Sequence, residues 1–259
     1  MAVRDAAYIE LYARDKLSTV DYFVSALGFT RVADSVGVDR SSVLLRGNGA
    51  RLLVTSGPAG WKFLDEHGDG IGDIAVTCDD VAETLDAAVV AGARMVGTMQ
   101  GNPMVTGFGG VVHTLLPHAG DLGSGLPPGR SWAACAPGGL TAQAGPVRTL
   151  DQVEICLERG SVAGYADFYH DAFGFHRSAS DNDTDGDGVR DSMVIRSRSE
   201  RITFALVAPD PLRSPGELDA FLARNGGPGV RRLVFSADRH DPVAHAFEGR
   251  AVAYGTVGE

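Results

Sequence analysis

The sequence of 259 residues has little that would span a membrane, bind nucleic acid or form a disulfide framework. No apolar run approaches the roughly 18 residues that cross a bilayer, and the first residues lack the apolar core of a signal peptide. The three cysteines, Cys78, Cys135 and Cys156, are too few and too widely spaced for a disulfide framework or a zinc knuckle. Lys and Arg number 23 against 33 Asp and Glu, a net charge of −10, which argues against a nucleic-acid partner. We therefore expect a cytoplasmic protein with no nucleic-acid or membrane partner.

The chain contains an internal repeat, because residues 20–31 recur in similar form as residues 166–177. Each copy has aromatic and aliphatic residues at helical spacing and then a glycine, Gly28 or Gly174. Glycine just past a helix adopts the left-handed conformation that ends it. A strand-like segment precedes each copy and two follow it, so each unit is predicted to be strand, helix, then two or three strands. The following strands are predicted at 42–46, 51–55, 192–196 and 202–207.

A second, weaker repeat relates residues 63–76 to residues 221–235. In both, a glycine turn leads into an apolar strand, and a helix is predicted next, at 81–91 and at about 242–247. The stretch from Pro117 to Gly145 is rich in Gly, Pro and Ala and has no periodicity, which is typical of a linker. We therefore predict a first domain at 1–118, a linker at 119–148 and a second domain at 149–259.

Several of these segments resemble the vicinal-oxygen-chelate superfamily, which includes glyoxalases, bleomycin-resistance proteins and dioxygenases. The similarity is sharpest to the group of 4-hydroxyphenylpyruvate dioxygenase and 4-hydroxymandelate synthase. The segments that carry it include Tyr8–Tyr12, His67–Ala75, Gly107–Leu115 and Gly226–Leu233. The resemblance implies an α+β fold of tandem βαβββ modules that form two half-open barrels. We expect the second barrel to be incomplete, because the sequence ends at Glu259 before the family's last strands.

The resemblance also locates the family's Fe(II) site, which is held by two His and one Glu of the second half. The positions of the two His are occupied here by Gln152 and Arg232, and the Glu belongs to the last strand. A neutral amide is a weak iron ligand, and a guanidinium has no lone pair and carries a fixed positive charge. We therefore expect no iron dioxygenase chemistry at this site and no cofactor.

A different chemistry is possible at these positions. Alternation along a strand places Gln152, Glu154 and Cys156 on one face, and Arg232 reaches the same space from the neighbouring strand. In one hypothesis Arg232 binds a carboxylate or enolate oxygen and Glu154 acts as general base. In the other, Glu154 and Arg232 form a structural ion pair or do not touch. The residues predicted to line the substrate pocket are Ser192, Thr203 and Cys156.

Two metal sites are further alternatives. Tyr8, Asp73 and His113 hold the equivalent positions of the first half, so Asp73 and His113 are candidate ligands of a divalent metal. A core histidine bonded to a carboxylate is the simpler interpretation. Separately, the acidic loop 181–191 has oxygens at alternate positions and a glycine at its sixth position, as in a calcium loop, although Ser192 replaces the usual final Glu. This loop is alternatively a solvated hairpin or a lid over the pocket. Its candidate calcium ligands are Asp181, Asp183, Asp185 and Asp187.

Three functions remain open from the sequence. The first is a metal-independent enzyme of specialised metabolism, such as antibiotic biosynthesis, that isomerises, cyclises or eliminates a small acidic or aromatic substrate. The second is a non-catalytic protein that sequesters a small molecule, and the third is a dioxygenase-like enzyme with a relocated metal. An incomplete second sheet would expose an edge, which a homodimer or a short strand at about 251–257 would cover.

Overall fold

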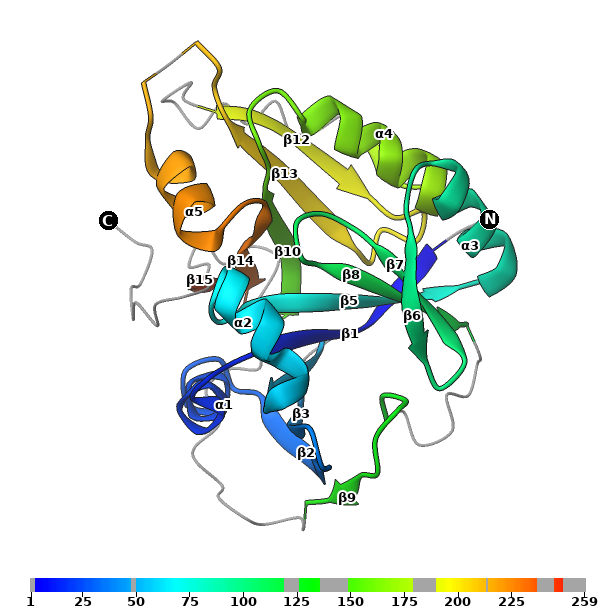
Figure 1. Cartoon of the computed structure of the whole chain (residues 1–259), viewed down its shortest axis with the longest axis vertical. Helices are drawn as coiled ribbons and strands as arrows, with labels where there is room; N and C mark the ends of the chain where they lie inside the picture. Colours follow the sequence, from blue (N-terminus) through cyan, green and yellow to red (C-terminus); the bar gives the residue numbers. More distant parts are fainter. Residues whose placement is uncertain are drawn as a thin grey trace.

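The computed structural model describes residues 3–47, 50–118, 126–135, 149–178, 190–212, 214–236 and 245–248. These residues form two β-sheets with a few helices packed on them, and neither sheet closes into a barrel (Figure 1). The α+β fold of paired βαβββ modules is thereby confirmed. In the described part of the chain, no helix combines the length and the apolar character needed to cross a membrane.

Sheet A has the strand order β6-β7-β8-β5-β1-β4-β3-β2-β9. Its strands are β1 (Val3–Tyr12), β2 (Thr30–Val36), β3 (Ser41–Arg46), β4 (Arg51–Ser56), β5 (Gly70–Cys78), β6 (Met95–Met99), β7 (Asn102–Thr106), β8 (Val112–Pro117) and β9 (Ala133–Ala134). The helices between them are α1 (Lys16–Ser25), the short 3-10 turn η1 (Pro58–Gly60), α2 (Trp61–His67) and α3 (Val81–Val90).

Sheet B has the order β11-β12-β13-β10-β14-β15. Its strands are β10 (Thr149–Cys156), β11 (His176–Arg177), β12 (Arg190–Arg196), β13 (Thr203–Pro209), β14 (Gly229–Ser236) and β15 (His245–Glu248). Two helices accompany it, α4 (Val162–Phe173) and α5 (Glu217–Asn225). The helix predicted at about 242–247 is wrong, because 245–248 form β15, which supplies backbone partners to the edge of β14. The closing strand predicted at about 251–257 lies outside the described residues.

The two sheets repeat one arrangement at their centres. The strand β1 is parallel to β4 and antiparallel to β5, and β10 is parallel to β13 and antiparallel to β14. Glu10 pairs with Asp73 across β1 and β5, and Glu154 pairs with Arg232 across β10 and β14. Glu10 and Glu154 are therefore counterparts in the two repeats.

Of the two glycines predicted to end the repeated helices, Gly174 is the left-handed C-cap of α4, whereas α1 ends at Ser25 with Ala26 as its cap and Gly28 follows in the next turn. Gly28 and Gly174 have φ angles of 72° and 71°, in the left-handed region that favours glycine. After the second helix, the backbone N–H of Phe175 donates back to the carbonyl of Tyr169, and this folds the phenyl ring onto the core. The backbone N–H of Phe29 likewise donates to the carbonyl of Phe23, so in both repeats a glycine and the phenylalanine after it turn the chain back onto the core.

One apolar core joins the sheets. The rings of Phe23 and Phe29 from the first repeat pack edge-on against Phe235 of β14, with centroids 6.3 and 5.5 Å away. The helix α3 packs on α4 and α2 on α5 (Figure 1). Because burial of these rings is shared between the repeats, separating the sheets would expose aromatic surface of both.

Part of the predicted linker belongs to sheet A. Ala133 and Ala134 pair with β2, and Leu126 and Trp132 pack on a buried cluster around Tyr8. We call residues 126–135 the covering segment, because it brings side chains onto the face of sheet A that carries the Tyr8 cluster. We call this the inner face of sheet A; its cluster is separate from the core that joins the two sheets. The predicted domain limits at 118 and 148 otherwise remain predictions.

Candidate active site

The six residues that the sequence predicts for the site share one face of sheet B. The register places Glu154 opposite Arg232, and Cys156 beside Val207, which itself lies opposite Ser192. Residues level with one another across a ladder point to the same side of a sheet. Val153 lies opposite Phe204, so extending this register by one residue puts Gln152 level with Thr203. The strand register thus places these residues on one side of the sheet, and their roles in a site remain predictions.

The residues of this face differ in exposure. Ser192 is exposed, Gln152 and Thr203 are half-buried, and Glu154 is buried. Cys156 is fully buried beneath α5, where it packs with Phe221. Burial raises the pKa of the Cys156 thiol to about 12, so the sulfur stays protonated and is a poor nucleophile. Cys156 therefore supports α5 and does not line an open surface.

The short ion pair of Glu154 is with Arg231, a residue that the sequence analysis missed. Arg231 Nη1 donates to Glu154 Oε1 at 2.6 Å, and both side chains are about nine-tenths buried, with 10% and 7% exposed. The backbone explains how Arg231, next to Arg232 in the chain, reaches this carboxylate. Glu154 is opposite Arg232 but Ile155 is opposite Val230, so Arg231 is the extra residue of a β-bulge.

A comparison of the repeats shows why an arginine fits at this bulge. Its counterpart in sheet A is Gly72, where an added Cβ would lie 2.4 Å from the ring of Tyr12. Tyr12 in turn corresponds to Cys156, because each lies opposite the first glycine of the next antiparallel strand. The smaller Cys156 leaves room for the side chain of Arg231. Between the first and second repeats, Gly72 is replaced by Arg231 and Tyr12 by Cys156. These two paired differences are the sequence signal that could have indicated a role for Arg231.

The N-terminus of α5 lies beside this ion pair. Arg231 Nη2 donates to Glu217 Oε2 at 3.3 Å, but the Glu217 side chain is 88% exposed, so this contact adds little stability. Asp219 holds the helix more firmly, since it accepts from the backbone N–H of Gly216 at 2.8 Å and from Arg159 Nη2 at 2.7 Å. These hydrogen bonds hold the pKa of Asp219 below its usual value.

The residues proposed for a metal in the first half do not come together. Asp73 accepts from the backbone N–H of Thr114 at 3.0 Å and from its hydroxyl at 2.6 Å, and the Tyr8 hydroxyl lies 3.4 Å away. His113 precedes Thr114 on β8, so its side chain points to the opposite face. The placement therefore argues against the predicted metal pair of Asp73 and His113.

His113 is a core histidine between the two sheets. Its Nδ1 lies 2.9 Å from the carbonyl of Ile74 and its Nε2 lies 2.9 Å from the hydroxyl of Tyr169. A carbonyl only accepts, so Nδ1 carries the proton and Nε2 accepts from Tyr169. Burial lowers the pKa of His113 to about 4 and keeps the ring neutral. The partners are a carbonyl and a hydroxyl, where we had expected a carboxylate.

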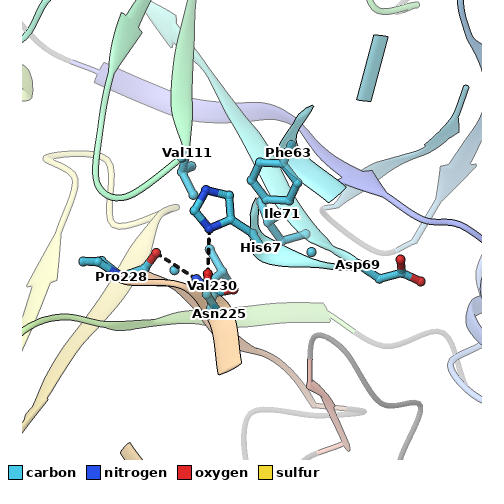
Figure 2. Close-up of a pocket in the computed structure, with 11 residues that line it drawn as sticks. Phe63, His67, Asp69, Ile71, Val111, Asn225, Pro228 and Val230 are labelled. Carbon is cyan, nitrogen blue, oxygen red and sulfur yellow. Dashed lines mark hydrogen bonds between the residues drawn. The ribbon is translucent and has the colours of Figure 1, made fainter. Parts of the chain in front are cut away.

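A crevice between the sheets is too small for a substrate. It is lined by residues of α2, α5 and the glycine turns that follow them, and its volume of about 10 Å³ admits about one water molecule. Figure 2 shows His67 donating from Nδ1 to the carbonyl of Asn225, at 2.7 Å, and Asn225 donating to the carbonyl of Pro228, at 2.9 Å. His67 and Asn225 are the last residues of α2 and α5, so the repeats meet through counterpart positions. This crevice is a structural joint.

The side chains at the family's iron positions do not fit Fe(II). Gln152 offers a weak amide oxygen, and Arg232 is joined by a second guanidinium, that of Arg231, on the neighbouring residue. Two fixed positive charges oppose a divalent cation, and neither has a lone pair to donate. Across the described residues, no three His, Cys, Asp or Glu side chains are grouped as metal ligands. The candidate calcium ligands Asp181, Asp183, Asp185 and Asp187 lie outside the described residues.

Comparison with known proteins identifies the family. The glyoxalase/bleomycin resistance protein/dioxygenase superfamily profile matches residues 6–109. The 4-hydroxyphenylpyruvate dioxygenase of Neurospora crassa is 25% identical over 209 residues, 74% of this chain and 50% of that protein. The enzyme of the same name from Dictyostelium discoideum is 22% identical over 274 residues, 96% of this chain and 74% of that protein. The chain thus spans about half the length of the Neurospora relative.

A solved structure is more similar in sequence. A variant of 4-hydroxymandelate synthase from Streptomyces coelicolor superposes with a TM-score of 0.76 and 35% identity, over 91% of this chain and 71% of that chain. The likeness extends over both sheets, well beyond the part that the superfamily profile matches. The chain therefore belongs to the glyoxalase/bleomycin resistance protein/dioxygenase superfamily and is homologous to 4-hydroxyphenylpyruvate dioxygenase and 4-hydroxymandelate synthase.

Proposed function

We propose that this protein is an enzyme that binds a small acidic or aromatic molecule on the described face of sheet B and moves a proton on it without an iron centre. The observation that carries the proposal is the buried contact of 2.6 Å between Glu154 and Arg231, next to Arg232. A carboxylate paired with one guanidinium, on a strand face that also carries Arg232, combines a proton acceptor with a donor for an anionic oxygen.

Each residue has a distinct part in this proposal. Arg232 binds the acid group or the enolate oxygen of the substrate, whose developing negative charge a guanidinium stabilises. Glu154 removes a proton from the carbon next to the carbonyl and returns it to another position, so the reaction is an isomerisation that needs no oxidant. Arg231 acts as a positioning residue, because it holds one oxygen of Glu154 in place.

The names of the relatives supply a probe. They refer to 4-hydroxyphenylpyruvate, a 2-oxo acid with an aromatic ring, which has a carboxylate for Arg232 and an acidic CH₂ group next to its carbonyl. Removal of a proton from this CH₂ gives an enolate, which takes up a deuteron from D₂O at the same carbon, so proton transfer appears as exchange of hydrogen for deuterium. Exchange can be followed by proton NMR in the presence of EDTA.

We expect the protein to accelerate this exchange over buffer alone, since a positioned general base contributes about 10²–10⁴-fold. Exchange no faster than in buffer would contradict the proposal. So would consumption of O₂ that depends on added Fe(II), because it would indicate the dioxygenase chemistry of the relatives.

A non-catalytic binding protein is the second candidate. It is favoured by the burial of Glu154, whose side chain is only 7% exposed and already paired with Arg231. A binding protein would hold 4-hydroxyphenylpyruvate in calorimetric titration, would not exchange its protons, and would keep its affinity in Glu154→Gln. A role in specialised metabolism, a cytoplasmic location and a homodimeric state remain predictions of the sequence.

A further inference from the structure

A second buried glutamate–arginine pair lies in the first repeat, away from the site proposed above. Arg130 of the covering segment donates through Nη2 to Glu10 Oε1, and their side chains are 1% and 2% exposed. Arg130 also donates from Nε to the hydroxyl of Ser42 at 3.1 Å, and Ser42 lies 2.8 Å from the hydroxyl of Thr55. Arg130 is therefore anchored on β1 and β3 from outside the strands of the repeat.

One nitrogen of this guanidinium has an unused hydrogen-bonding capacity. Arg130 Nη1 is enclosed and has no hydrogen-bond partner among the described residues. A buried donor, above all a charged one, is normally paired. Since Nη2 and Nε already contact Glu10 and Ser42, Nη1 is the edge that remains for an acceptor oxygen.

The surroundings suit a small acid with an apolar body. Burial, reinforced by the charge on Glu10, raises the pKa of Tyr12 and keeps its hydroxyl neutral, while Arg40 adds a second guanidinium near Glu10. Asp73, opposite Glu10, is buried so completely that its pKa rises to about 7, which limits the negative charge facing an anion. The apolar part of this inner face consists of Ala7, Ala33, Leu44, Leu53, Ala75 and Leu116.

We propose that the inner face of sheet A is a second binding site, for a small carboxylate whose oxygen accepts from Arg130 Nη1. Guanidinium and carboxylate groups match in charge and in planar geometry, and one guanidinium can bridge two carboxylates through different edges. The covering segment carries Arg130 and lies over this face, so entry of the ligand displaces part of that segment. The site is independent of Glu154 and Arg232.

Trp132 provides a local reporter for the test. Its indole N–H donates to the carbonyl of Pro127 within the covering segment, at 2.8 Å, and its ring packs near Tyr8. The chain has two tryptophans, and the other, Trp61, is 59% exposed. In Trp61→Phe, Trp132 is therefore the sole tryptophan, and its fluorescence can be titrated with benzoate, with the neutral benzamide as comparison.

We expect a saturable change in Trp132 emission with benzoate. Benzamide should bind with an affinity at least about tenfold lower, a difference of about 1.4 kcal/mol in binding free energy. Arg130→Met should weaken benzoate binding by a similar factor. The matched control Arg46→Met removes an exposed arginine of the same sheet and should leave the affinity unchanged. If Arg130→Met does not fold by circular dichroism, the charge-neutral pair Glu10→Gln with Arg130→Met serves in its place.

Three results would overturn the proposal. The first is the absence of saturable binding up to tens of millimolar benzoate, which would mean that the partner of Arg130 Nη1 is a water molecule and not a carboxylate. The second is equal binding by the folded Arg130 variant. The third is loss of the signal in Arg232→Ala with Arg130 intact, which would locate the bound carboxylate on sheet B.

Discussion

Glu10 and Glu154 occupy the same position in the two repeats, and each is buried against an arginine. The two arginines do not occupy equivalent positions in the repeats. Glu10 pairs with Arg130 from the covering segment, and Glu154 pairs with Arg231 from a β-bulge. The same requirement, a partner for a buried carboxylate, is thus met from different parts of the chain. A buried charge without a partner is far more costly than a paired one, and the first prediction depends on this difference.

Loss of the arginine in the second repeat should destabilise the protein. In Arg231→Met the Glu154 carboxylate stays buried without its 2.6 Å donor, so we expect the free energy of unfolding to fall by about 3–5 kcal/mol. Urea unfolding followed by circular dichroism measures the change. Arg198→Met, which removes an exposed arginine, should stay within about 0.5 kcal/mol of the parent. Equal stability of Arg231→Met and the parent would show that the pair is not structural.

Stability should decrease as the pH rises toward neutrality because of Asp73. Burial raises the pKa of Asp73 from 3.8 to about 7. Between these values the folded state keeps a proton that the unfolded state has lost, so the contribution is complete below pH 3.8 and is lost as the pH passes 7. We expect the melting temperature to fall between about pH 4 and 7 and to level off above that, and the slope in this range to flatten in Asp73→Asn. An identical slope in the variant would locate the titration elsewhere.

The bond between His113 and Tyr169 should contribute to the joining of the repeats. Tyr169→Phe removes the hydroxyl that donates to His113 Nε2 at 2.9 Å and leaves a buried acceptor without its partner. We expect a loss of about 1–3 kcal/mol in the free energy of unfolding. Tyr165→Phe, on the same helix and half-buried, is the matched control and should lose less. A larger loss at Tyr165 would mean that the buried hydrogen bond is not the cause.

The joint between α2 and α5 should tolerate no added methyl group at Gly110. A Cβ there would lie 2.3 Å from Nε2 of His67, the ring whose Nδ1 donates to the carbonyl of Asn225. Gly110→Ala should therefore cost about 1–3 kcal/mol through overpacking. Gly164→Ala, on α4 with open space around it, should instead stabilise by about 0.5–1 kcal/mol. Thermal unfolding of the two variants in parallel distinguishes steric conflict from a general effect of the substitution.

Much of the fold was predictable because the repeat is local and strongly patterned. The left-handed turns at Gly28 and Gly174, which follow the repeated helices, and the strands at the centre of each sheet follow from spacing alone. The register was harder, because a single bulge decides that Arg231 reaches Glu154 at 2.6 Å beside the predicted Arg232. No pattern within residues 229–236 shows which residue is the extra one.

The partners of Glu10 and His113 could not be predicted for a different reason. Arg130 lies 120 residues from Glu10, in a stretch whose Gly and Pro content is typical of a linker. Tyr169 lies 56 residues from His113 and has helical spacing that indicates a core position. Such long-range pairs depend on how the two sheets pack, which strand and helix periodicity does not determine.

The central claim, that Glu154 transfers a proton on a bound acid, is tested most directly by the exchange rate of 4-hydroxyphenylpyruvate in D₂O with EDTA. We predict that Glu154→Gln lowers the protein-dependent rate by about 10²-fold or more while calorimetry still detects binding, and that the exposed control Glu200→Gln keeps the parent rate. An unchanged exchange rate in a folded Glu154→Gln protein would contradict the account.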